Sequence, residues 1–203
     1  MKKAINSTKS LIVSAAWKLF YENGYDNTTV DDIVEASGTS KGSFYHYFDS
    51  KESLPASLGY LFDEKYEELA ASMDPSMGAD EKLIYLNQEL FLMIENTVAV
   101  DLLSRLFSSQ LISKAEQSLL DNNRTYYRLL RQIAVEGLKD GTFRTEFTTN
   151  DIIKAYAMFE RGLMYDWCLS SGNYSLCQYS KTMLPAFLQV FCTEPAAKES
   201  LNK

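Results

Sequence analysis

Apolar residues recur at intervals of three and four positions along almost the whole of this chain, and seldom at intervals of two. Positions three and four apart lie on one face of an α-helix, whereas a β-strand requires alternation. Proline and glycine, which most often interrupt helices, number only 4 and 9 among the 203 residues. The pattern therefore predicts an all-α protein with few loops.

Breaks in this periodicity divide the chain into successive predicted helices. Gly24 and Gly38 follow the first two, and loops at 73–78 and 140–144 separate later ones. Helices often end at glycine because glycine adopts the left-handed conformation without steric cost. The predicted helices span about 7–23, 30–37, 40–47, 51–72, 79–96, 98–109, 115–140, 151–170 and 175–193.

Two short predicted helices pair closely within residues 29–48. Thr29 precedes the first, and Asp32 follows it by three positions, which is the spacing of a capping box. Thr39 or Ser40 caps the second helix, directly after the tight turn at Gly38. This arrangement is typical of a helix-turn-helix. Any helical hairpin is the alternative, but the short helices and tight turn favour the DNA-binding form.

The segment TSKGSFYHYF, which ends this pair, combines a small, basic start with four aromatic rings. Backbone N–H groups at a helix start attract phosphate, and Lys41 can reach a phosphate or a guanine edge. Gly42 allows the backbone to approach the major groove, and Tyr45 lies one turn after Lys41. Phe44 and Phe48 lie on another face, where we expect them to pack against the helical core. The segment therefore predicts a polar DNA-binding face and an apolar core face.

Alternatives to this interpretation exist for single residues. Gly42 could simply weaken its helix, at a cost of about 1 kcal/mol relative to alanine. His46, the only histidine, could be an ordinary surface residue. No second histidine or cysteine lies near it in sequence, so no metal site is predicted, and no motif calls for a cofactor.

The charge and cysteine content exclude several classes of protein. A net charge of −7 argues against a protein that coats nucleic acid nonspecifically. The acidity lies mainly in residues 56–203, which carry a net −6, against −1 for residues 1–55. Cys168, Cys177 and Cys192 lack CxxC spacing and are predicted to be reduced thiols, although a redox role stays open. Without a signal peptide or a long apolar span, we expect a cytoplasmic protein with no membrane partner.

The stretch GYDNTTVDDIVEASGTSKGSFYHYFDSKESL, residues 24–54, resembles the N-terminal signature of the tetracycline-repressor (TetR) family of transcriptional regulators. The likeness lies in the Gly-aromatic pair, the Thr-Thr before an Ile-containing helix, the Ser-Lys-Gly, and the Phe and Ser-Lys-Glu that follow. Thr39 departs from the valine most common in the family, and His46-Tyr47 reverses the frequent Tyr-His order. The resemblance covers about residues 7–66.

The resemblance implies an N-terminal three-helix helix-turn-helix DNA-binding domain at 1–50. A larger C-terminal helical domain at 51–203 would bind a ligand and dimerise, giving an Ω-shaped homodimer. Lys41, Gly42 and Tyr45 would lie nearest the bases. Phosphates would be held mainly by Thr29, Ser40 and His46, with Lys51. The full implied set of DNA contacts is Thr29, Thr39, Ser40, Lys41, Gly42, Ser43, Tyr45, His46, Tyr47 and Lys51.

Apolar stripes on the last two predicted helices indicate a dimer. A helix that is apolar on more than one side needs packing partners on more than one side, and a four-helix bundle across a two-fold axis supplies them. Packing within one subunit is the alternative. The expected interface residues are Ile152, Tyr156, Phe159, Leu163, Leu176, Tyr179, Met183, Phe187 and Val190.

Aromatic residues interspersed with polar ones in the middle helices predict a cavity for a mostly apolar small molecule. Simple core packing is the alternative for each of them, and Arg161 could pair with a ligand carboxylate. The expected lining is Phe91, Phe107, Gln110, Tyr126, Tyr127, Arg161, Tyr165 and Trp167.

Together with these features, the resemblance implies a repressor that binds a palindromic DNA operator as a homodimer and is released by a small, mostly apolar effector. An enzyme is not predicted, because the chain has no P-loop or HExxH motif and only one histidine. Two alternatives remain open: a helical interaction protein, and an activator with the same DNA-binding head and no small-molecule inducer.

Overall fold

The computed structural model describes residues 8–112 and 118–193 and is built from α-helices, as the periodicity predicts. In the described residues the only β-type pairing is an isolated bridge between Phe143 and Cys192. No helix within these residues is long and apolar enough to cross a lipid bilayer. The α-helices are α1 Thr8–Asn23, α2 Val30–Ser37, α3 Lys41–Tyr47, α4 Leu58–Ser72, α5 Ala79–Thr97, α6 Val100–Ile112, α7 Thr125–Asp140, α8 Thr149–Leu169 and α9 Leu176–Leu188.

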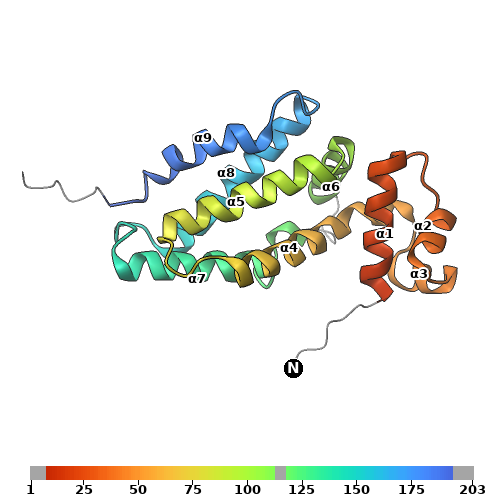
Figure 1. The fold of residues 1–203 in the computed structure, drawn as a ribbon, viewed down its shortest axis with the longest axis horizontal. Coiled ribbons are helices and arrows are strands. Elements are labelled where there is room, and N and C mark those ends of the chain that lie inside the picture. The colour runs from red at the N-terminus through yellow and green to blue at the C-terminus, as the bar shows by residue number, and fades with distance from the viewer. Residues whose placement is uncertain (1–7, 113–117, 194–203) are drawn as a thin grey trace, which may run out of the picture.

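Helices α1 to α3 form a small head at one end of the molecule, and α4 leads from it into the larger body (Figure 1). The head encloses its own group of buried side chains. Phe44 from α3 is fully buried, as are Ile33 from α2 and Phe20 from α1. The rings of Phe44 and Phe48 lie 5.7 Å apart between centroids. The predicted core face of the aromatic segment is therefore confirmed.

Local caps hold the two short helices of the head. Thr29 and Asp32 form the predicted capping box at the start of α2, where each side chain bonds the other residue's backbone N–H. Gly38 ends α2 with a φ of 63°, a left-handed conformation that glycine adopts at little cost. Ser40 caps α3 and accepts a hydrogen bond from the Ser43 N–H at 3.0 Å.

The prediction of one continuous helix over 51–72 is wrong. Two 3₁₀ turns, Lys51–Ser53 and Pro55–Ser57, precede α4, which begins at Leu58. Pro55 has no N–H to donate into an α-helical ladder. The Ser57 hydroxyl bonds the Leu54 carbonyl at 2.5 Å and accepts the Trp17 indole N–H at 3.2 Å. The junction between head and body is thus a short, tight segment, and α1 of the head is tied to it.

The predicted helix at 115–140 also differs from the structure. Its first residues lie outside the described ranges, as does residue 7 at the predicted start of the first helix. A 3₁₀ turn follows at Ser118–Leu120, and α7 begins only at Thr125. Asp121 explains the break, because its side chain accepts the Asn123 N–H at 2.9 Å and its carbonyl accepts the Arg124 N–H at 3.1 Å. Such local Asp turns compete with helix.

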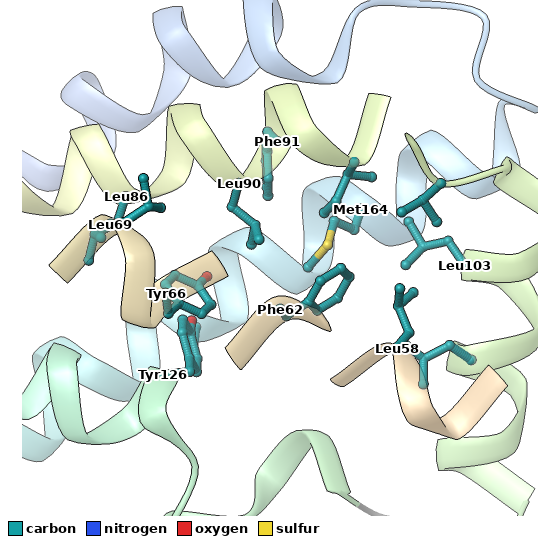
Figure 2. Packing of buried hydrophobic residues seen from close by; sticks show 14 of the residues in the cluster. Leu58, Phe62, Tyr66, Leu69, Leu86, Leu90, Phe91, Leu103, Tyr126 and Met164 are labelled. Carbon is teal, nitrogen blue, oxygen red and sulfur yellow. The ribbon is translucent and has the colours of Figure 1, made fainter. Parts of the chain in front are cut away.

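The body packs α4 to α9 around a single apolar core. Figure 2 shows Tyr66 and Leu69 of α4 lying against Leu86 and Leu90 of α5, with Tyr126 of α7 beside Tyr66. The rings of Tyr66 and Tyr126 are 5.0 Å apart between centroids. The three cysteines are partly buried and unpaired, and burial raises the pKa of each thiol.

Gly137 is needed for the close approach of α7 to its neighbours. A Cβ on Gly137 would lie 2.6 Å from the Ala79 Cβ and closer still to the Phe143 ring. We expect Gly137→Ala to lower the free energy of unfolding by about 1–3 kcal/mol, because overpacking outweighs the gain of about 1 kcal/mol in helix propensity. Urea denaturation measures the difference.

The matched control is Gly42→Ala, whose Cβ would meet only the Ser40 hydroxyl oxygen, at 3.7 Å. This variant should be as stable as the wild type or more so. Equal stability of both variants would show that Phe143 moves aside at no cost.

Candidate DNA-binding site and interior cavity

The exposed face of α3 carries most of the predicted DNA contacts. Lys41, Gly42 and His46 are exposed, and Tyr45 is 54% exposed. The Tyr45 ring stands edge-on to the buried Phe44 ring, with the centroids 5.3 Å apart. A rigid apolar contact thus supports a side chain that projects into solvent. Short helices with such a face fit the major groove of DNA.

Three hydroxyl side chains among the expected DNA contacts already have hydrogen-bond partners in the head. The Thr29 hydroxyl lies 2.7 Å from an Asp32 carboxylate oxygen, and the Thr39 hydroxyl lies 2.8 Å from that of Ser37. The Ser40 hydroxyl lies 3.0 Å from that of Ser43. These side chains therefore stabilise the backbone conformation of the turn and of the start of α3. A phosphate oxygen of DNA would have to share these hydroxyl groups with their present partners.

The remaining predicted contacts flank this face. The rings of His46 and Tyr47 touch at right angles, 4.7 Å between centroids, and both side chains are exposed. The Lys51 ammonium donates to the carbonyls of Tyr25, at 2.9 Å, and Thr28, at 3.0 Å. Because an ammonium carries three protons, Lys51 can brace the loop between α1 and α2 and still offer one donor to a phosphate.

An ion pair across the two helices of the motif was not predicted from the sequence. The Lys41 ammonium lies 2.6 Å from the Asp31 carboxylate of α2, and both side chains are largely exposed. The hydrogen bond to Asp31 raises the pKa of Lys41. Solvent screens such a pair, so DNA phosphates can compete for Lys41. The ten positions that separate the two residues carry no periodic signal, which is why sequence reasoning missed the pair.

We expect Asp31→Asn to tighten DNA binding roughly threefold to tenfold, because it removes an anion that repels DNA and that competes with DNA for Lys41. Fluorescence anisotropy with labelled operator DNA across a salt series measures the change. Glu22→Gln is the matched control, since Glu22 also pairs with a lysine on the head, Lys18, but lies on α1. Weaker binding by Asp31→Asn would mean instead that Asp31 orients Lys41 for DNA.

An inner cavity of about 40 Å³ lies inside the body, and α4 forms part of its wall. Five helices meet around it, and Figure 2 shows Phe62, Tyr66 and Met164 in this region. The volume is enough for a few atoms rather than for a whole drug-sized molecule. The inner cavity is lined by Phe62, Tyr66, Leu90, Leu103, Leu106, Phe107, Leu119, Arg124, Tyr126, Glu160, Arg161 and Met164.

An outer pocket of about 520 Å³ adjoins the inner cavity and opens to solvent. The two share Phe107, Leu119 and Arg161 as common wall residues. These three residues therefore lie between the two spaces. The outer pocket is lined by Phe107, Gln110, Leu111, Leu119, Leu120, Arg161, Gly162 and Tyr165.

Five of the eight residues expected around the ligand line one or both of these spaces. Phe107 and Arg161 border both, Tyr126 borders the inner cavity, and Gln110 and Tyr165 border the outer pocket.

The other three expected ligand residues, Phe91, Tyr127 and Trp167, lie outside both linings. Phe91 is fully buried in the core, and the Trp167 indole donates to the Tyr174 carbonyl at 2.9 Å. The Tyr127 hydroxyl is held between the Leu119 carbonyl and the Arg161 guanidinium, at 3.3 and 3.2 Å. For these three residues the alternative of simple packing is the better interpretation.

Glu160 is the polar residue of the cavity that sequence reasoning missed. Its carboxyl is buried and accepts hydrogen bonds from the Asn87 amide at 2.9 Å and the Tyr126 hydroxyl at 2.7 Å. Burial raises the pKa of Glu160. A signal was present: Glu160 lies midway between Tyr156 and Met164 at intervals of four, and is thus an acid on the buried stripe of α8.

Two polar networks connect the cavity to the rest of the fold. Asn87, which binds Glu160, also accepts a hydrogen bond from Ser180 of α9. On the other side, the Arg124 guanidinium binds Asp63 at 2.9 Å and the Gly59 carbonyl at 2.7 Å, both on α4. The lining is therefore bonded both to α9 and to the helix that leads to the head.

Three of the expected interface residues must be removed from that set. Ile152, Tyr156 and Leu176 are buried inside a single chain, and the Tyr156 hydroxyl donates to the Leu83 carbonyl at 2.8 Å. The sequence stripes included these residues because a helix packed on two sides is apolar on both. Their positions place them on the side that faces the protein's own core.

The opposite side of α8 and α9 leaves an apolar face exposed. Phe159 of α8 stacks on Phe187 of α9, with the ring centroids 4.5 Å apart, and both remain partly exposed. Leu163 is also partly exposed. We call this surface the α8–α9 face; its large exposed side chains are Met158, Leu169, Tyr179, Met183 and Val190.

Comparison with known proteins matches the head to one family. Residues 12–58 match the model described as bacterial regulatory proteins, tetR family. The HTH-type transcriptional repressor KstR2 of Rhodococcus jostii is 33% identical over 141 residues, which are 66% of this chain and 67% of the relative.

Solved structures are similar over most of the chain. The fatty acid degradation regulator FadR from Bacillus halodurans has a TM-score of 0.64 at 23% identity, covering 92% of this chain and 97% of that one. FadR from Bacillus subtilis, in complex with stearoyl-CoA, has a TM-score of 0.61 at 19% identity, covering 88% and 97%. At such identities the likeness concerns the fold.

Proposed function

The chain belongs to the TetR family of bacterial transcriptional regulators, and on that premise we propose that it represses its target genes as a homodimer bound to a palindromic operator. A small, mostly apolar effector releases the protein from DNA. The protein is a regulator and not an enzyme. The observation that carries the proposal is the face of α3, where Lys41 and Tyr45 project outward from a helix seated on the buried Phe44.

We assign direct contact with base edges to Lys41, Gly42 and Tyr45. Thr29, Ser40, His46 and Lys51 contact phosphates, with Ser43, Thr39 and Tyr47 near them. Arginine and lysine read guanine edges in the major groove, and contacts to phosphate fix the register. The set of ten residues is that expected from the sequence, and the exposure of most of the α3 side chains supports it.

We assign dimerisation to the α8–α9 face. One head makes few contacts, whereas a two-fold dimer presents two heads to half-sites about 34–36 Å apart or at a related spacing. Large apolar side chains gathered on one exposed face are typical of an obligate interface. Met158 and Leu169 join Phe159, Leu163, Tyr179, Met183, Phe187 and Val190 in the proposed interface.

We assign the effector site to the outer pocket together with the inner cavity. Phe62 and Tyr66 of α4 line the inner cavity, and the same helix leads to the head through the two 3₁₀ turns. The Lys9 ammonium of α1 also bonds the Tyr60 hydroxyl of α4 at 2.9 Å. An effector that displaces α4 would therefore change the spacing of the two heads. The similar fold of FadR, which holds stearoyl-CoA, supports a mostly apolar effector.

We place the boundary between the two domains at residue 50, with the head at 1–50 and the body at 51–203. The 3₁₀ turn at Lys51–Ser53 begins there. An activator with the same head, or an interaction protein without an effector, are the alternatives. An activator would increase transcription of a promoter that it binds, and an interaction protein would bind no operator.

The proposal is tested by binding of the purified protein to DNA from upstream of its own gene, in a salt series. We expect two subunits per palindrome and an affinity that falls steeply with salt. Transcription in vitro from the same fragment should decrease when the protein is added. If no site emerges there or from a genome-wide selection, the proposed function is wrong.

A further inference from the structure

We propose that the inner cavity binds a hydroxyl group of the effector, held between the Tyr66 hydroxyl and the Glu160 carboxyl, while the apolar body of the effector fills the outer pocket. The inference rests on the proposed function and specifies the chemistry of its effector: an alcohol on an apolar skeleton. Four properties of the cavity lead to it: a Tyr66 hydroxyl that donates to no other described residue, a Glu160 carboxyl that can accept a further hydrogen bond, a lining whose charges are paired, and a small volume.

Tyr66 supplies the unused donor. Its side chain is 2% exposed and lines the inner cavity, and its hydroxyl bonds no other residue in the part of the chain that the structure describes. Among the described residues, the only fully enclosed side-chain nitrogen or oxygen without a partner is the Arg144 Nε, so the Tyr66 hydroxyl is open to the cavity and can donate into it. The adjacent Tyr126, by contrast, has its hydroxyl bonded to Glu160 at 2.7 Å. A group that enters the cavity could therefore accept a hydrogen bond from Tyr66.

Glu160 supplies the acceptor. One carboxyl oxygen accepts the Asn87 amide and the other accepts the Tyr126 hydroxyl, and the Tyr156 hydroxyl, which donates to the Leu83 carbonyl, is a third polar neighbour of the carboxyl. Each carboxylate oxygen has two lone pairs, so capacity remains for a further donor from the cavity side. A hydroxyl is the smallest group that donates to Glu160 and accepts from Tyr66 at once. It can also bond Glu160 in either protonation state, which matters because burial raises the pKa of this carboxyl.

The charges of the lining favour a neutral group. Arg124 is already paired with Asp63, and Arg161 lies beside Glu160 in sequence and bonds the Tyr127 hydroxyl. An ammonium would enter a cavity lined by two guanidinium groups, and a carboxylate would approach the Glu160 carboxyl. Neither ion gains enough to offset the loss of its water in so apolar a space.

The volumes divide the effector into a small polar end and a larger apolar part. The inner cavity of about 40 Å³ accommodates a hydroxyl with one or two carbons. The outer pocket of about 520 Å³ accommodates the rest. Phe107 belongs to both linings and packs edge-on against Tyr165 at 6.4 Å between centroids, so it is the side chain that must move for the two to join.

Isothermal titration calorimetry of the full-length protein tests the inference, with 1-decanol below its solubility limit and decanoic acid and decylamine below their micelle concentrations. We expect decanol to bind at least about tenfold more tightly than the acid or the amine. Tyr66→Phe should weaken decanol binding about fivefold to tenfold, the value of one buried hydrogen bond. Its thermal midpoint should not fall, because the hydroxyl that it loses has no partner in the free protein.

Tyr85→Phe is the matched control. It removes a hydroxyl from α5 that lies outside both linings, 3.4 Å from the Ser72 hydroxyl, and decanol affinity should stay within about twofold of wild type. Unchanged binding in Tyr66→Phe, tighter binding of the acid or amine, or no binding of any probe would overturn the inference.

DNA binding by the same samples distinguishes failure of the hydroxyl site from failure of the proposed function. Loss of the decanol preference with intact operator binding rejects only the hydroxyl site, whereas absence of operator binding rejects the proposed function.

Discussion

A Lys41→Ala/Tyr45→Ala protein should bind operator DNA at least about 1,000-fold more weakly than the wild type. A dimer presents two copies of each side chain, so the double variant removes four contacts, and a good base contact discriminates by 1–3 kcal/mol. The fold should be unaffected, because Lys41 and Tyr45 are both exposed. Fluorescence anisotropy measures the affinity, and circular dichroism with thermal unfolding checks the fold.

The head itself offers a matched control for this variant. Lys18→Ala/Tyr21→Ala removes the same two residue types from α1, where both are exposed but lie outside the predicted DNA contacts. Its operator affinity should stay within a few-fold of wild type, with a similar dependence on salt. Equal losses in both double variants would mean that the head binds DNA through general charge rather than through the face of α3.

Met183→Asp should convert the protein to a monomer and thereby abolish binding to the full palindrome. Met183 lies on the α8–α9 face and is 39% exposed in one chain, so the chain can fold without its burial. In a two-fold interface the substitution places an unpaired carboxylate from each subunit in an apolar contact, at a cost of about 3–5 kcal/mol. Analytical ultracentrifugation measures the monomer–dimer equilibrium.

Val135→Asp provides the control for an added charge, since Val135 is an exposed apolar residue of α7. That variant should remain dimeric and bind operator normally. If Met183→Asp remained a dimer at micromolar concentration, the interface would lie on another face. Monomeric Met183→Asp with undiminished operator affinity would contradict the proposal that two heads act together.

Much of the head was predictable because its structure depends on local interactions. The capping box of Thr29 and Asp32 and the left-handed turn at Gly38 connect residues within three or four positions. The spacing of Phe44 and Phe48 also placed both rings on one side of α3. The all-α class follows from the same kind of local periodicity, and so does the end of α7 at Gly141, which has a φ of 85°.

Residues on α8 show where local pattern stops being informative. Tyr156 and Phe159 are both large, aromatic and three apart, and both were assigned to the dimer interface. Only the packing of α8 against its neighbours separates them, burying Tyr156 against the Leu83 carbonyl and leaving Phe159 at the α8–α9 face. Hydrophobicity shows that a side chain avoids water, but not which surface covers it.

The sequence by itself determined the helical class, the helix-turn-helix and the exposed face of α3 that we propose as the DNA-binding face, because each of these is specified by residues within one or two helical turns. Tertiary structure alone decided the ion pair of Lys41 with Asp31, the division between core and α8–α9 face, and the partners of Glu160. Asn87 and Glu160 are 73 positions apart and hydrogen-bond at 2.9 Å. Contacts over such distances arise from the packing of helices against one another, which the period of a single helix does not encode.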